Sequence, residues 1–300
     1  MSTGLSIVLF PVALGIVMLG LGLTLTVDDF RRVVTYPRAV LVSLFCQMLV
    51  LPVICLGLVV AAGLRAELAV GMMLLAASPG GSTASLYSHL FKGNVALNVT
   101  LTAINSVLAL FTLPLIVNLS VAAFIGSDSS IGLQFDKVLQ VFALVLIPIS
   151  IGMVVRRRRP DFAARMQRPV KILSIVVLVV VLTGAVIGIK DELAATVGAV
   201  GLIALLFNLV SLAIGYAAPR LLGVGHREAV ASSFEIGIHN ATLAITIALS
   251  PALLDNNDIA MPPAIYGTLM FFTAAVFGFV AARRGHVGAD TTRRRRTTAA

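Results

Sequence analysis

Nine apolar stretches, each long enough to cross a lipid bilayer, follow one another along the 300 residues of the chain. A spanning helix needs about 20 largely apolar residues. Because lipid offers no hydrogen-bond partners, spanning segments are helices or closed barrels, and stretches of this length indicate helices. They cover residues 5–26, 39–63, 67–90, 95–125, 135–155, 170–189, 193–217, 227–250 and 262–282. We therefore expect an all-α integral membrane protein with nine transmembrane helices.

The charge content argues against a soluble protein and against a nucleic-acid partner. Only 12% of the residues are charged and 59% are hydrophobic, whereas soluble domains carry about 25% charged residues. The net charge of +9 comes from basic residues in short connections between apolar stretches and at the C-terminus. That placement is typical of a membrane protein. The lipid bilayer is the expected partner, and nucleic acid is not.

The distribution of lysine and arginine predicts the orientation in the membrane. Of the 22 basic residues, all but Arg65, Lys137 and Lys190 fall on one side of the nine stretches. The basic side of a multi-pass protein faces the cytoplasm. We expect a plasma-membrane protein with its N-terminus outside and its C-terminus in the cytoplasm. It would have one transmembrane domain over residues 1–282 and a basic cytoplasmic tail over 283–300 without fixed structure.

Glu235 is the acidic residue that falls well inside an apolar stretch. An ionisable group in the membrane is costly and by default indicates a functional site. His239 lies four residues on and shares a face with Glu235 if the segment is helical there. Gly, His and Asn within FEIGIHNAT are poor helix formers, and unwinding would expose carbonyl groups for a cation beside the carboxylate. A purely structural Glu235–His239 pair is the alternative.

A second interruption, SPGGSTAS, covers residues 78–85. Pro79 cannot continue a helix, and the glycines after it release the backbone. A broken spanning helix exposes the N-terminus of its second half, where partial positive charge and free N–H groups suit an anion. Ser82, Thr83 and Ser85 add hydroxyl groups there. The segment is expected to hold an anion, and a simple Pro-Gly kink is the alternative.

Further polar residues lie in two other stretches. Asn98, Thr102 and Asn105 share one helical face through their i, i+4, i+7 spacing, and Gln47 is an isolated amide. Such groups either join helices or line a site. The residues alone leave both interpretations open, although an isolated amide more often joins helices.

The two interruptions fall in the third and eighth stretches, five stretches apart. An odd offset reverses the direction through the membrane, so the first four and the last four stretches are expected to be inverted repeats. Interruptions at corresponding positions of two such halves indicate a transport site near the midplane.

Several segments resemble the bile acid:sodium symporter family. They are LGLGLTLTVDDF from Leu19, QMLVLP from Gln47, SPGGSTAS, FKGNVALNVTLT from Phe91 and FEIGIHNATLA from Phe234. The resemblance implies the nine-helix form of this fold, in which two broken helices cross within a core domain and a panel domain packs beside it. The core would comprise about residues 39–125 and 193–282, and the panel about residues 5–26, 135–155 and 170–189.

The resemblance also implies two sodium sites and one anion site. The first sodium site would comprise Gln47, Glu235, His239 and the carbonyl groups of Ile236 and Ile238. The second would comprise Ser85, Asn98 and Thr102. His239 stands where the family has a glutamine, and Ala84 with Ser85 stands where it commonly has Ser-Asn, which removes ligands. The anion would lie at the starts of the two half-helices, at Ser82 with Thr83 and at Asn240.

The expected function is secondary active transport. It is sodium-coupled symport of a small organic anion by alternating access, the anion being bile-acid-like, pantoate-like or another carboxylate or sulfonate. Sodium is the coupling ion and no cofactor is implied. Proton coupling through Glu235 and His239 is the alternative within this class. A membrane-embedded enzyme or sensor is disfavoured, because an enzyme needs a nucleophile beside a base or a metal cluster.

Overall fold

The structure is a computed structural model that describes residues 12, 15–126, 135–170, 172, 173, 176, 193–251 and 253–297. Side chains are described in these ranges except at 82, 135–142, 144, 193–196 and 284–297. All regular structure in the described part of the chain is helical, apart from one isolated bridge. This confirms the expected all-α class for the described residues.

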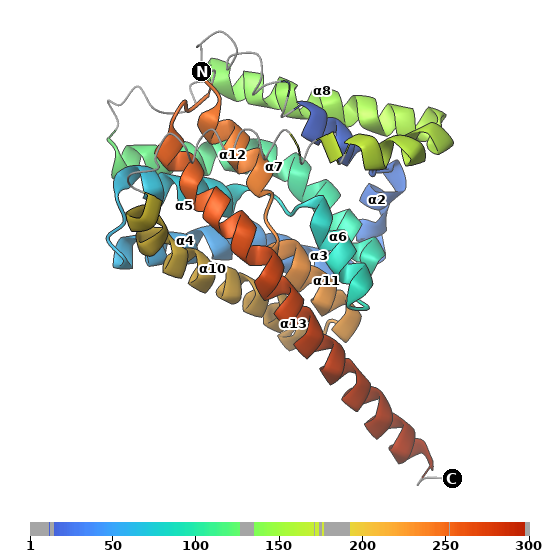
Figure 1. The fold of residues 1–300 in the computed structure, drawn as a ribbon. Helices are drawn as coiled ribbons and strands as arrows, with labels where there is room; N and C mark the ends of the chain where they lie inside the picture. Colours follow the sequence, from blue (N-terminus) through green and yellow to red (C-terminus); the bar gives the residue numbers. More distant parts are fainter. Residues whose placement is uncertain are drawn as a thin grey trace.

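The helices form one bundle with a layer along its edge. In chain order they are α2 (Val27–Arg31), a 3-10 turn (Arg32–Val34), α3 (Pro37–Phe45), a π-helical turn (Cys46–Val50), α4 (Leu51–Ala61), α5 (Ala66–Ala77), α6 (Ser82–Leu90), α7 (Val95–Phe124), α8 (Phe135–Arg158), α10 (Leu193–Leu221), α11 (His226–Gly237), α12 (Ala241–Leu249) and α13 (Asn257–Thr297). Residues 15–22 and 160–170 are also helical. In Figure 1, α8 lies along the upper edge of the bundle with α2 beside its right end.

Four helical segments within the described ranges are long and apolar enough to cross a membrane. They are Pro37–Ala61, Val95–Phe124, Val197–Leu221 and Asn257–Arg283. Each matches a predicted stretch. Most of 170–189 and about half of 5–26 lie outside the described residues. The number of nine transmembrane helices therefore stays a prediction.

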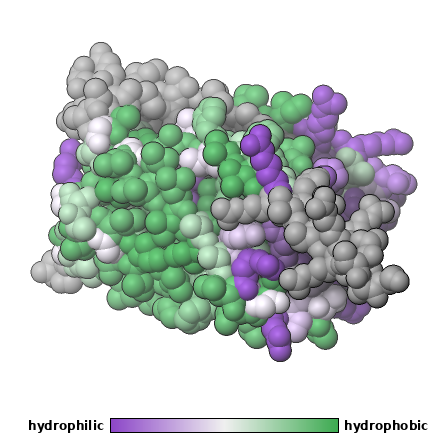
Figure 2. Space-filling view, turned by 90° about the horizontal axis from the view of Figure 1, so that it is seen from below, coloured by the Kyte–Doolittle hydropathy of each residue, from purple (hydrophilic) through white to green (hydrophobic). Residues whose placement is uncertain are grey.

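The long helices turn apolar side chains outward. Only 33–39% of each spanning window is buried. The outward positions nevertheless carry leucine, valine and phenylalanine, such as Leu41, Val53, Phe111, Leu119 and Phe272, each more than half exposed. Figure 2 shows the result, a hydrophobic face over the left and centre, with hydrophilic side chains gathered toward the right end. A surface of this kind fits lipid as its solvent.

Helix starts carry side chains that satisfy unpaired backbone N–H groups. Asn94 begins α7, where its Oδ1 accepts from the Leu97 N–H at 3.1 Å. Asn256 serves α13 in the same way, accepting from the Ile259 N–H at 3.1 Å. Asparagine is a favoured N-cap residue for this reason. These caps fix where two of the long spans begin.

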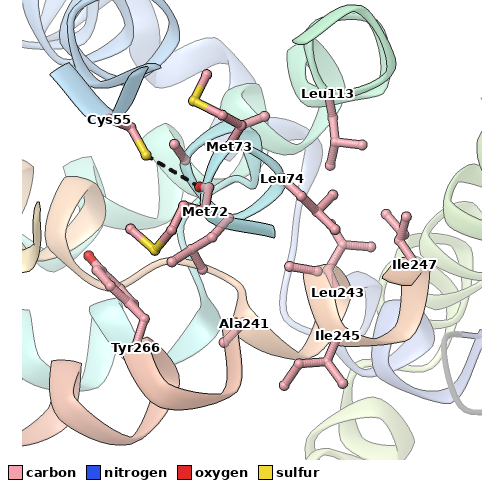
Figure 3. Close-up of a cluster of buried hydrophobic side chains, with 14 of the residues drawn as sticks. Cys55, Met72, Met73, Leu74, Leu113, Ala241, Leu243, Ile245, Ile247 and Tyr266 are labelled. Carbon is pink, nitrogen blue, oxygen red and sulfur yellow. Dashed lines mark hydrogen bonds between the residues drawn. The ribbon is translucent and has the colours of Figure 1, made fainter. Parts of the chain in front are cut away.

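Two short helices occupy the centre of the bundle. Every residue of α5 from Leu68 to Ala77 is buried, and so is all of α12 except Thr242. Figure 3 shows Leu243 and Ile247 of α12 facing the side chains of α5 and α7. Because α5 and α12 are buried on all sides, they are held by protein and not by lipid.

The C-terminal segment differs from expectation. Residues 283–297 continue α13 without interruption and project from the bundle (Figure 1), whereas the sequence predicted a tail without fixed structure. The physical reason is that extending an existing helix adds a hydrogen bond per residue and needs no new nucleus.

Candidate functional site at the crossing of two broken helices

Both predicted interruptions are present in the structure. The first lies between Ala77, where α5 ends, and Ser82, where α6 begins. The second lies between Gly237, where α11 ends, and Ala241, where α12 begins. In each case a 12-residue half-helix is followed by a nine-residue half-helix.

The two unwound segments hydrogen-bond to each other. The N–H of Asn240 donates to the Pro79 carbonyl at 2.8 Å, and the N–H of Gly81 donates to the Ile238 carbonyl at 2.9 Å. Together these bonds form one antiparallel bridge. Backbone groups at membrane depth need partners within the protein, and here each break supplies partners to the other. The broken helices therefore cross at this bridge.

Gly80 brings the first break directly against Glu235. A methyl group on Gly80 would lie 2.7 Å from Glu235 Oε2 and would overlap Oε1 and Cδ. At the neighbouring Gly81 the nearest atom to such a methyl group would be the His239 carbonyl oxygen, at an ordinary 3.5 Å. Neither glycine has a positive φ. Gly80 is thus required for close approach of the carboxyl group and not for backbone conformation.

The Glu235 side chain is 2% exposed, and only one of its two carboxyl oxygens accepts a hydrogen bond. Its Oε2 accepts from the Thr102 hydroxyl at 2.5 Å, and that hydroxyl also lies 3.1 Å from the Asn98 carbonyl. The Asn105 side chain lies near the carboxyl group, yet neither its Nδ2 nor Glu235 Oε1 makes a hydrogen bond of ordinary geometry among the described residues. A buried acceptor without a partner is costly, so Oε1 is a position where a ligand would gain free energy.

Gln47 and His239 form a second polar group beside the breaks. Tyr266 donates to the Gly237 carbonyl at 2.9 Å, so it accepts from His239 Nδ1 at 3.0 Å. His239 Nε2 then carries the lone pair and accepts from Gln47 Nε2 at 3.3 Å. That amide also donates to the Ser78 carbonyl at 3.1 Å. Gln47 Oε1 has no partner within the described chain.

The position of Gln47 follows from a local irregularity of its helix. Residues Cys46–Val50 form a π-helical turn between α3 and α4. Pro52 lies just beyond it and lacks the N–H that would continue the regular pattern. Single π-helical turns are frequent at functional sites. Gln47 lies within this π-helical turn, between the regular helices α3 and α4.

The condition under which His239 would share a helical face with Glu235, a helix that continues through His239, is not met. The helix ends at Gly237, so the four-residue spacing no longer aligns the two side chains. The hydrogen bonds of His239 go to Gln47 and Tyr266. The two acceptors that lack partners, on Gln47 and Glu235, therefore belong to separate hydrogen-bonded groups.

The two predicted sets of cation ligands are physically connected. Asn98 accepts from Ser85 at 2.8 Å and donates to the Ala231 carbonyl at 2.9 Å. Thr102, one turn further along α7, reaches Glu235. Thr102 thus joins the Ser85–Asn98 group to the carboxylate that was assigned to the other set. Of the predicted carbonyl ligands, Ile238 already accepts from Gly81, and Ile236 is a buried residue of α11.

The residues predicted to bind the anion lie at the starts of α6 and α12. Ser82 is the first residue of α6, and its side chain lies outside the described part. Thr83 is half-buried beside it. Asn240 caps α12, with its Oδ1 accepting from the Leu243 N–H at 3.0 Å. Both helix N-termini therefore meet at the crossing, where their partial positive charges add.

A small cavity of about 20 Å³ adjoins the crossing. Pro79 and Asn240 line it on one side, and residues of helix 15–22, α7, α8 and α12 close it on the others. No lysine or arginine is among its described lining residues. It has room for about one water molecule and not for an organic anion in this conformation.

Sequence reasoning missed the residues that complete the second break. Asn208 and Tyr266 both donate to the Gly237 carbonyl, at 2.8 and 2.9 Å, and Thr273 donates to the Asn208 side chain. The signal in the sequence that could have found them is a polar side chain within an apolar stretch. Asn208 is such a residue, whereas Tyr266 carries only one hydroxyl group on a largely apolar side chain.

Apolar spanning helices around two paired helix breaks place the chain among helical integral membrane proteins. A sequence model of the Sodium Bile acid symporter family matches residues 11–214 of the 300. The chain belongs to this family, which is a family of transporters and not of enzymes. The matched range ends before Glu235 and the second break, so the match does not depend on those residues.

Curated relatives span bacteria, plants and animals. The chain is 30% identical over 235 residues to the uncharacterized sodium-dependent transporter YocS of Bacillus subtilis, covering 78% of this chain and 72% of that protein. It is 28% identical over 265 residues to the probable chloroplastic sodium/metabolite cotransporter BASS2 of Oryza sativa, covering 88% and 62%. It is 27% identical over 286 residues to the human ileal sodium/bile acid cotransporter, covering 94% and 81%.

Proposed function

We propose that the protein is a secondary active transporter that couples the import of a small organic anion to sodium. The observation that carries this proposal is the half-satisfied Glu235 carboxylate, buried beside two crossing helix breaks. The names of the relatives, which include sodium-dependent and sodium/bile acid cotransporters, support sodium as the coupling ion. The substrate class is a carboxylate or sulfonate, with bile-acid-like and pantoate-like anions as candidates.

The cation binds at Glu235. Sodium favours hard oxygen ligands, and Oε1 of Glu235 and Oε1 of Gln47 are buried oxygens without partners in the described chain. Thr102 holds the other carboxylate oxygen at 2.5 Å and fixes its direction. Asn98, Ser85 and the carbonyl groups of Ile236 and Ile238 complete the two ligand sets, and His239 orients Gln47.

The anion binds at the N-termini of α6 and α12, near Ser82, Thr83 and Asn240. Because no basic side chain lines the adjoining cavity among the described residues, the negative charge would be balanced by helix N-termini. An unoccupied Glu235 carboxylate would repel the anion. A bound sodium ion neutralises that carboxylate, so the two ligands favour each other's binding.

Alternating access accounts for the small size of the cavity. It lies where the predicted core, represented by α7 and α12, meets the predicted panel, represented by helix 15–22 and α8. Relative motion of panel and core would open it to either side of the membrane. The equal lengths of the half-helices and their antiparallel bridge support inverted repeats, and the lysine and arginine bias supports a cytoplasmic C-terminus.

Proton coupling is the second candidate, and it would act through the contact between His239 and Gln47. The ring is hydrogen-bonded as a neutral group, with Nε2 accepting from Gln47. If Nε2 gained a proton, the Gln47 amide would have to turn so that its free Oε1 accepts from the ring. That turn would remove Oε1 from the cation, so proton and sodium would compete.

The deciding experiment is the thermal stability of the purified protein, titrated with sodium against potassium at two pH values. A ligand that binds only the folded state at 100 times its Kd stabilises it by about 2.7 kcal/mol. We expect a saturable sodium-specific rise in Tm that Glu235→Gln abolishes. Glu67→Gln, a half-buried glutamate at the start of α5, is the matched control and should keep the rise. A sodium response that survives in Glu235→Gln would contradict the proposal. A response to pH alone that requires His239 would favour proton coupling.

A further inference from the structure

A second cavity, of about 440 Å³, lies away from the helix crossing. Its walls come from the segment around α2 and from the C-terminal end of α8. The charged residues that line it are Asp28, Arg31, Arg156 and Arg157. None of them belongs to the predicted sodium or anion sites.

The charge of this cavity is unbalanced. Three arginines and one aspartate line it. Asp28 pairs with Arg31 at 3.5 Å across an exposed surface. Arg156 and Arg157 have no ion pair or hydrogen bond of their side chains within the described chain. Two guanidinium groups are therefore available, and their planar forks match the oxygen atoms of a phosphate group.

Exposed apolar side chains run along another face of α8. Ile147, Ile151 and Val154 are 50–58% exposed, and their spacing of four and three residues puts them on one helical face. By helical spacing that series continues at Arg158, whereas Met153, Arg156 and Arg157 share a different face of α8, which lines the cavity. Hydrophilic side chains gather at one end of the molecule, at the right of Figure 2, the side where α2 and one end of α8 lie in Figure 1.

We propose that the cavity between α2 and the end of α8 binds a phosphate group, held by Arg156 and Arg157. The cavity lies at the hydrophilic end of the molecule, so one source of this group is the headgroup of an anionic phospholipid whose acyl chains lie in the bilayer. A soluble phosphate ester offers the same chemistry without the chain. General attraction between basic residues and anionic lipid does not need a cavity, so the test must separate the arginines that line it from those that do not.

The chain provides that control within one basic run. Arg156 and Arg157 line the cavity, whereas Arg158 and Arg159 carry the same charge and do not. The full-length protein in neutral detergent is titrated with phosphatidylglycerol, phosphatidylcholine or glycerol 3-phosphate while its Tm is followed. We expect saturable stabilisation by phosphatidylglycerol, with an apparent affinity about 25-fold weaker in Arg156→Gln/Arg157→Gln, at about fivefold per arginine.

Arg158→Gln/Arg159→Gln should keep nearly the full affinity. A response to glycerol 3-phosphate with the same dependence on Arg156 and Arg157 would support the phosphate site and identify a soluble ester as its source. Equal loss in both double variants, or no saturable response to either phosphate compound, would overturn the proposal. If the first double variant does not fold, Arg31→Gln tests the opposite wall. It removes one positive charge and leaves Asp28 without its partner at the cavity, so the expected loss is about fivefold.

Discussion

Replacing Gly80 by alanine is the sharpest perturbation of the cation site that the structure offers. The added methyl group would overlap the Glu235 carboxyl group, with Oε2 at 2.7 Å. Since the side chain is 2% exposed and bonded to Thr102, it has little room to move. Overpacking a close-packed interior costs about 1–3 kcal/mol. If that cost falls on the sodium-bound state, the sodium Kd rises by about 5- to 150-fold.

Gly81→Ala is the matched control, because it makes the same change one residue away in the same break. Its methyl group would meet the His239 carbonyl oxygen at 3.5 Å, and Gly81 has an extended conformation that alanine adopts readily, with φ of −90° and ψ of 155°. We expect its sodium Kd to stay within about twofold of the wild type, because surface-like substitutions without a named mechanism stay within about 0.5 kcal/mol.

The assay is the sodium dependence of Tm for the three proteins, measured against potassium at constant ionic strength. Gly80→Ala should need more sodium for the same rise, while Gly81→Ala should follow the wild type. A wild-type sodium response in Gly80→Ala would refute the placement of the cation at the Glu235 carboxylate. Equal losses in both variants would show that any change in the break disturbs binding.

Two further substitutions separate local hydrogen bonding from helix packing. Thr102→Val keeps the side-chain shape but removes the hydroxyl that donates to Glu235. We expect the free energy of unfolding in sodium-free buffer, measured by denaturation, to fall by about 1.5–3 kcal/mol. An unchanged value would show that the hydrogen bond contributes nothing to stability. Gly152→Ala places a methyl group 2.7 Å from backbone atoms of the helix 15–22 segment. We expect Tm to fall while the sodium-dependent rise in Tm keeps its size. Loss of that rise would show that this helix contact controls the cation site.

The sequence by itself predicted the interruptions of both central helices. Pro79 removes a donor, and the Gly, His and Asn around residues 237–240 are poor helix formers, so each break follows from local chemistry. The position of Glu235 inside an apolar stretch was equally visible, because an acidic residue there can be read from the residue order and is costly in lipid. These inferences needed only the residue order and the properties of the bilayer.

The partners of the side chains could not be predicted in this way. Helical spacing suggested that His239 faces Glu235, yet the helix ends first and His239 bonds to Gln47 and Tyr266. Thr102 contacts Glu235 across 133 residues of sequence. Such contacts depend on how α7 and α11 pack, and no local pattern records that packing.

The sequence by itself determined that the protein lies in lipid, that it is helical and where its helices break. Each of these depends on hydropathy or on backbone chemistry within a few residues. The tertiary structure alone decided that the two breaks bond to each other and that Gly80 lies against Glu235. It alone also showed that Gln47 and Glu235 each keep an unpartnered oxygen in the described chain. The physical reason is that a buried polar atom is satisfied or left free by neighbours distant in sequence, and only the packed helices bring those neighbours within hydrogen-bonding distance.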